Sequence, residues 1–410
     1  MKKFFMYAVC AAFAGLTSCS SDEEFVNVYN PANESSETPI MLAMSKSNID
    51  FTTRGTGAVG DDNNKWRGEK LNVYMLNSET FELATGYNDE PIFENAEITA
   101  PASTDHSNIY ANYGISKYYP MSGNYNFFMY HADDAATAAP AKNAEGDMYI
   151  LPITIDGSQD IMISKADMPA AQKSAFEALP EVGTANAHRY YSAFSARRKI
   201  GINGQPDELG IQPHFVLQHL LSRIVFYIQP NDEKVSDKNT DGTNYYGVTI
   251  ESVKIKNVKT SAEFVVAWNG ATPAKFILNE TNPTDVTLKE LVAGETEAHA
   301  LQPFTPVKPV WDTVENKAVS TKVGESLMLF PADEYELEIN MSQKPSADRD
   351  PINFTHRQIL RVPAAAGKFE AGKQYNVKFV VYGAEKIDFS LELTNWEEGG
   401  DIDASFETKE

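Results

Sequence analysis

The chain has 410 residues, with 57 Asp and Glu against 35 Lys and Arg, and its formal net charge is -22. This balance argues against a nucleic-acid-binding protein, which needs a basic surface. Hydrophobic residues make up 42% of the chain and aromatic residues 11%, which is enough apolar material for two domains. Both cysteines, Cys10 and Cys19, lie near the N-terminus, so we expect no disulfide in the folded part.

Residues 1–18 have the pattern of an export signal. Two lysines precede an apolar run from Phe4 to Leu16, and this run is too short for a permanent membrane helix. The next residues, up to Cys19, resemble the lipobox of bacterial lipoproteins. That resemblance implies cleavage before Cys19 and lipid attachment to its thiol, which gives durable anchoring when several acyl chains are present. The alternative is an ordinary signal peptide with an incidental cysteine.

The acidic residues that follow Cys19 are similar to the surface-export signal of Bacteroides-like lipoproteins. A merely solvated tether explains residues 20–38 equally well, because they are polar and rich in Asn, Glu and Ser. Together with the lipobox, a surface-export signal at this position predicts that the protein is located at the outer membrane.

Two short segments with apolar residues at every second position come next, as expected for half-buried strands. The apolar positions of the second segment are shifted by one residue relative to those of the first. Arg54 and a loop rich in Gly, Asp and Asn follow the second segment. The first set is Ile40, Leu42 and Met44, and the second is Ile49, Phe51 and Thr53.

From Trp66 onward the chain reads as short strands between turn residues. Many are rich in β-branched and aromatic residues, and long helical patterns do not alternate with them, which predicts all-β antiparallel sandwiches with few short helices. One helix is predicted near residues 169–179. A Gly, Pro and Asp-rich stretch at 201–212 divides the remaining chain into sandwiches at 55–212 and 213–410. Examples of the predicted strands are 71–76, 125–130, 224–228, 248–255, 335–339 and 375–381.

Several short phrases, taken together and in this order, resemble the fimbrillin family, the subunits of type V pili in Bacteroidales. The phrases lie at 118–120, 125–130, 159–162, 215, 219–224, 327–331, 369, 372–375 and 396. The resemblance implies two tandem transthyretin-like β-sandwiches delivered to the outer membrane as a lipoprotein. It also implies that a trypsin-like protease cuts after an Arg in the N-terminal segment. The first strand then leaves, and a strand of another subunit fills the groove.

The bond between Arg54 and Gly55 fits such a cleavage site. Trypsin-like enzymes need an accessible, extended chain with Arg or Lys entering an acidic pocket, and exposed polar loops are where nicking concentrates. Residues 19–54 would then be a propeptide whose exchangeable strand carries Ile49, Phe51 and Thr53. Three rival sites remain open: Lys46, Lys65 and Arg67.

The C-terminus carries two further alternating sets, separated by Gly399 and Gly400. We interpret the first as the last core strand and the second, which is acidic and terminal, as the donor strand; the opposite assignment remains open. The first set is Ile387, Phe389, Leu391 and Leu393, and the second is Ile402, Ala404 and Phe406.

Neither an enzyme nor a cofactor or metal site is expected. The seven histidines form no close zinc pattern, and nucleophile-elbow, phosphate-loop and dinucleotide motifs are absent from the sequence. The expected partners are other fimbrial subunits, an Arg-specific protease, the lipid on Cys19 and a host or bacterial surface ligand. The alternative function is an unprocessed surface lipoprotein that binds glycans, although the tyrosines that suggest it fit edge and core packing better. These tyrosines are Tyr110, Tyr113, Tyr118 and Tyr119.

Overall fold

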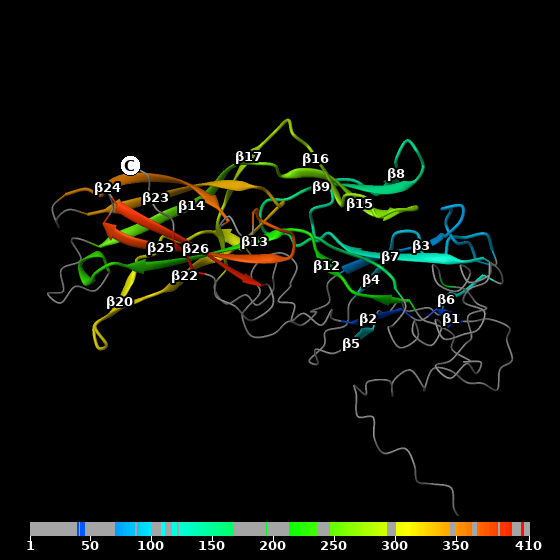
Figure 1. The fold of residues 1–410 in the computed structure, drawn as a ribbon, viewed down its shortest axis with the longest axis horizontal. Helices are drawn as coiled ribbons and strands as arrows, with labels where there is room; N and C mark the ends of the chain where they lie inside the picture. Colours follow the sequence, from blue (N-terminus) through cyan, green and yellow to red (C-terminus); the bar gives the residue numbers. More distant parts are fainter. Residues whose placement is uncertain are drawn as a thin grey trace, which may run out of the picture. The chain divides into compact units, whose positions relative to one another are not determined.

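Strands dominate the regular structure of the computed structural model (Figure 1). The one helical element among the described residues is a single 3-10 turn, η2 (Glu233–Val235). The all-β class is therefore confirmed, whereas the helix predicted at 169–179 lies outside the described residues. The structure describes residues 39–40, 42–45, 70–86, 88–99, 108–110, 117–120, 123–167, 194, 213–236, 247–292, 301–344, 349–362, 367–383, 386–395 and 403–405. All of them belong to one unit, residues 37–410.

The first sheet is buried on both faces. Because consecutive side chains of a strand point to opposite faces, Val73 and Met75 enter one core while Tyr74 and Leu76 enter another. The strand order is β12 (Gln218–His219), β10 (Met162–Lys165), β7 (Tyr125–His131), β3 (Lys70–Asn77) and β4 (Ala96–Thr99).

A second sheet packs on one face of the first. The core between them is rich in aromatic rings, and Phe128 meets Trp268 edge to face at 4.8 Å between ring centroids. The central pairing joins segments from either side of residue 212, and the division into domains at that point stays a prediction. The strand order is β16 (Phe276–Leu278), β15 (Ser261–Trp268), β9 (Met148–Thr154) and β8 (Ala141–Lys142).

Two larger sheets enclose the third core and form a sandwich. Phe226 and Phe379 come from one sheet, and Val253 and Leu337 come from the other. All pairings within both sheets are antiparallel except the parallel pair of β13 and β25. One sheet has the order β22 (Thr321–Leu329), β13 (Ser222–Pro230), β25 (Lys373–Gly383), β26 (Lys386–Asn395) and β27 (Asp403–Ser405). The other has the order β17 (Thr284–Thr287), β14 (Val248–Val258), β23 (Glu334–Gln343) and β24 (Ile352–Arg361).

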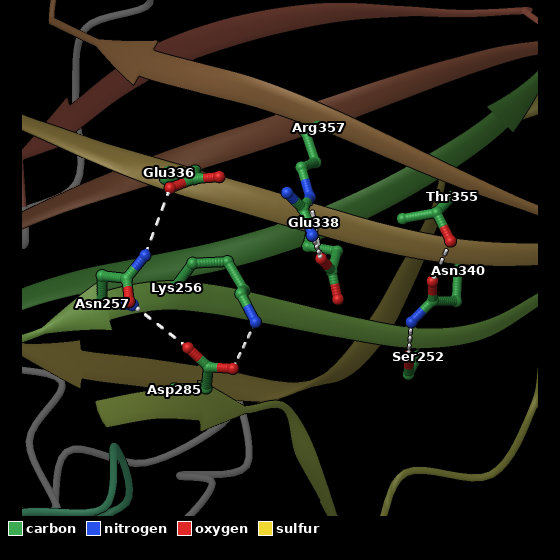
Figure 2. Close-up of polar contacts among 9 residues, drawn as sticks. All are labelled: Ser252, Lys256, Asn257, Asp285, Glu336, Glu338, Asn340, Thr355 and Arg357. Atoms are coloured by element: carbon green, nitrogen blue, oxygen red, sulfur yellow. Dashed lines mark hydrogen bonds and ion pairs between the residues drawn. The ribbon is translucent and has the colours of Figure 1, made fainter. Parts of the chain in front are cut away.

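The last of these sheets carries a row of paired polar side chains opposite its core face (Figure 2). Asn340 donates to Ser252 Oγ at 2.9 Å and accepts from Thr355 Oγ1 at 2.7 Å. Arg357 contacts Glu338 Oε2 through Nε at 3.0 Å and through a terminal nitrogen at 2.9 Å. Such cross-strand pairs fix the register of β14, β23 and β24 from the solvent side.

Four small groups of strands complete the described structure. They are β1 (Pro39–Ile40) with β6 (Lys117–Tyr118); β11 (His214–Phe215) with β2 (Ala43–Ser45) and β5 (Asn108–Tyr110); β18 (Lys289–Leu291) with β19 (Leu301–Pro303); and β20 (Val310–Asp312) with β21 (Lys317–Val319). Among the described residues no helix has the length and apolar character needed to cross a membrane.

Candidate functional site

The N-terminal strand β2 is the middle strand of a three-stranded sheet. On one side it runs antiparallel to β5, with Ala43 opposite Tyr110. On the other side it runs parallel to β11, with Met44 opposite Phe215. Just before it, β1 pairs with β6. Segments far apart in the sequence are therefore joined by the first residues that the structure describes, drawn in blue in Figure 1.

The same N-terminal segment closes a hydrophobic core. Ile40 and Leu42 are each 1% exposed, and they belong to the cluster that covers the outer face of the first sheet. Val73, Phe127 and Met129 are among their partners in this cluster. Full burial of one such side chain contributes about 1.5–3 kcal/mol, so the two side chains hold the segment firmly to the sheet.

The described members of this core cluster are aliphatic or aromatic. Tyr125 belongs to the same cluster, and burial raises the pKa of its hydroxyl above the usual value. Its ring therefore stays neutral across the physiological range. The described residues of the site offer a strand apolar packing and backbone pairing.

Removal of residues up to Arg54 would leave a strand-shaped gap. β5 and β11 would both lose a hydrogen-bonding partner, and the core would lose Ile40 and Leu42. Unpaired backbone groups beside apolar pockets are the features that bind an added strand. The geometry also defines the direction of an occupant, which must run parallel to β11 and antiparallel to β5 to repeat the existing bonds.

Most of the site residues predicted from the sequence lie outside the described residues. These are Cys19, Ile49, Phe51, Thr53, Arg54, Gly55, Ile402 and Phe406. Ala404 lies in β27, where it is paired with Leu391 at the edge of the sandwich. Of the first alternating set, Ile40 lies in β1 and Met44 in β2, while Leu42 lies between the two strands. Leu391, from the first C-terminal set, is a core residue.

The exchangeable strand predicted at Ile49, Phe51 and Thr53 lies outside the described residues and stays a prediction, whereas the pairings that the structure shows involve residues 39–45. The alternating pattern there was visible, but the second pattern, with Ile49 and Phe51, lies closer to Arg54. The alternating sequence pattern does not identify the distant partner strands β5 and β11. Without these partners, β2 cannot be recognised as the central strand of its sheet.

The tyrosines that suggested a glycan-binding face differ in how far their side chains are exposed to solvent. Tyr118 is 40% exposed, whereas Tyr119 is 6% exposed and packs edge to face against Phe127. Tyr119 is therefore a core residue. Within the described stretches, no group of three or more His, Cys, Asp or Glu side chains is placed to hold a metal ion.

No family model matches the chain, and no curated protein matches it. Among solved structures, it is similar to a candidate cell-adhesion protein of Bacteroides uniformis at 14% identity and a TM-score of 0.44, over 90% of this chain and 100% of the other. It is also similar to fimbrilin FimA of Porphyromonas gingivalis, at 12% identity and a TM-score of 0.35, over 88% and 99% of the two chains. The fimbrial anchor protein Mfa2 of the same organism gives 10% identity and a TM-score of 0.33, over 88% and 98%. These sequence identities and TM-scores are too low to assign a function to this chain.

Proposed function

We propose that this chain is a structural subunit of a surface fimbrium, assembled by strand exchange. It reaches the outer membrane as a lipoprotein through Cys19 and is cleaved after Arg54. The observation that supports this is the placement of β2, which precedes Arg54 in sequence and yet is the central strand of its sheet. Cutting the chain after Arg54 would convert a built-in strand into a replaceable one.

Before cleavage the covalent connection keeps the N-terminal strands at high effective concentration near their own groove. An exposed, unpaired edge promotes aggregation, so retaining the strand until the cell surface is reached protects the subunit during export. After cleavage the segment competes as a separate molecule and carries the lipid of Cys19 away with it. The lipid then serves delivery, and only an uncleaved subunit keeps it as an anchor.

The C-terminal tail is the donor in this proposal. Ile402, Ala404 and Phe406 repeat the two-residue spacing of Ile40, Leu42 and Met44. A tail inserted between β5 and β11 of another copy would therefore present apolar side chains at alternate positions, as the groove requires.

Limited trypsin digestion of the exported protein tests the proposal. The expected new N-terminus is Gly55, and electron microscopy should show filaments only after the cut. Arg54→Ala should block both, while the matched change Lys46→Ala should leave both intact. The proposal fails if no cut falls between Lys46 and Arg67, or if the cleaved protein stays monomeric.

A further inference from the structure

The strand β24 forms the longest uninterrupted sheet edge in the described part of the chain. It has 10 residues, and all of them pair with β23 without a register shift. On its other side no described strand pairs with it (Figure 1). The outer strands of the four- and five-stranded sheets otherwise have four residues or fewer, except β22, whose pairing with β13 is interrupted by a bulge.

This edge lacks the features that usually keep other chains away. Proteins protect long edges with lysine, proline, bulges or short strands, and the sequence Ile352–Arg361 contains neither lysine nor proline. Its two arginines are engaged by their own sheet, since Arg357 contacts Glu338 and Arg361 contacts Glu334 (Figure 2 shows the first pair). An unpaired edge whose charges are neutralised within its own sheet is a template for another strand.

The side chains of β24 give this edge an apolar surface. Alternate residues face the core of the sandwich; among them Leu360 is buried, and Phe354 packs against the core while only partly buried. Ile352, on the same face, is 50% exposed. A strand added beside β24 would cover Ile352 and Phe354. Because β24 contains no Asp or Glu, it offers no local repulsion to another copy of this acidic chain.

Alternation and charge together select one register for two copies of β24. A two-fold axis makes the pairing antiparallel and self-complementary, and the core-facing residues must stay on one face of the joined sheet. An axis at Arg357 would place this residue opposite its own copy, and like charges directly opposite each other are destabilising. An axis at His356 avoids this conflict, and axes farther toward either end pair fewer residues. It places Ile352 opposite Leu360, and Thr355 opposite Arg357.

We propose that two copies of this chain pair antiparallel through β24, so that the two sheets join into one continuous sheet. The interface uses no residue of the N-terminal segment, so subunits would associate side by side whether or not strand exchange occurs. The formal net charge of -22 on each copy opposes the approach. Salt screens this repulsion beyond about 8 Å at physiological ionic strength, so the association should strengthen as the salt concentration rises.

Sedimentation equilibrium of the purified full chain carrying Cys19→Ala and Arg54→Ala tests the inference, because neither a lipid nor strand exchange then contributes. At pH 8, where histidine side chains are ordinarily uncharged, the expected dissociation constant of the dimer is below about 100 μM. Thr355→Arg should weaken the dimer at least about fivefold, since it opposes Arg357 twice in each dimer, and Thr355→Glu should strengthen it by a similar factor. Both variants lose the hydrogen bond from Thr355 to Asn340, so this loss cannot explain opposite effects.

Thr287 provides the matched control, because it is exposed in β17 at the opposite edge of the same sheet. Thr287→Arg and Thr287→Glu should leave the dissociation constant unchanged. Net charge alone would give the reverse order of the Thr355 variants, since arginine lowers the negative charge and glutamate raises it.

Deletion of residues 401–410 distinguishes a second copy of β24 from the C-terminal tail as the occupant of this edge, and the shortened chain should still form the dimer. The inference is overturned if the chain stays monomeric at about 100 μM, if the two Thr355 variants do not shift the dissociation constant in opposite directions, or if the deletion abolishes the dimer. Each of these results would leave the proposed strand exchange untouched.

Discussion

At the residue scale, Lys275 shows two opposing effects on one charge. Its Nζ lies 3.2 Å from the centroid of the Trp268 ring and has no hydrogen-bond partner within the described part of the chain. Stacking on the ring favours the charged amine. Burial, together with the nearby charge of Lys165, lowers the pKa of Lys275 to about 8. In the direction set by burial, the folded chain holds this proton less tightly than the unfolded chain does.

This difference predicts a rise in stability with pH. Between pH 8 and 10.5 the unfolded chain binds more protons at this residue, so the free energy of unfolding increases as pH rises through that window. Below the window the cost of charging the buried amine is present in full. Lys275→Met should therefore stabilise the chain at neutral pH by about 1 kcal/mol, a value reduced for partial exposure. The same substitution should also remove the part of the rise in the free energy of unfolding that Lys275 causes between pH 8 and 10.5.

Urea unfolding near pH 7 measures the stabilisation by Lys275→Met. A comparison with urea unfolding near pH 10 measures the change in the pH dependence of stability. The exposed Lys234 provides the control, since Lys234→Met should leave the pH profile of the parent chain unchanged. A loss of stability near pH 7 in Lys275→Met would show instead that stacking on Trp268 dominates.

At the scale of the elements, strand positions could be predicted from the sequence better than strand partners. The segments predicted at 125–130 and 248–255 appear as β7 and β14 with ends shifted by at most a few residues, because β-branched and aromatic residues suit a pleated, buried surface. The burial of both faces of β3 could not be predicted, since it depends on β15 and on Ile40 and Leu42, which lie in segments remote from β3 in sequence.

The burial of the N-terminal segment predicts an effect on stability that differs between the uncleaved and the cleaved chain. Leu42→Ala should lower the free energy of unfolding of the uncleaved protein by about 2–5 kcal/mol, the cost of emptying a buried leucine site. Once residues up to Arg54 have been cut off and removed, the variant and the parent are the same molecule and should unfold identically. Chemical denaturation before and after trypsin treatment measures both values.

Val314→Ala is the control for this experiment, because Val314 is 92% exposed and its truncation should change stability by less than about 0.5 kcal/mol. A Leu42→Ala protein as stable as the parent before cleavage would contradict the placement of Leu42 in the core.

At the scale of the whole molecule, both ends of the chain cover a strand edge. The N-terminal segment fills the gap between β5 and β11, and β27 covers the edge of β26 through three residue pairs. An uncovered edge invites pairing with other chains. The formal net charge of -22 opposes unspecific association. If the proposed strand exchange occurs, these features would restrict assembly to sites where a matching strand meets a vacated groove.

Deletion of residues 401–410 separates the fold from assembly. The deletion removes β27 but leaves Leu391, Val377 and Phe379 in the core, so the thermal unfolding midpoint of the shortened chain should stay close to that of the parent. Because the proposed donor residues Ile402, Ala404 and Phe406 are lost, the proposed function predicts that the cleaved protein no longer elongates filaments, although its own groove should still accept the tail of an intact copy. Mixing shortened and intact subunits should therefore shorten the filaments seen by electron microscopy, while Lys409→Ala should leave their length unchanged. Filaments of normal length from the shortened chain alone would exclude the tail as the donor strand.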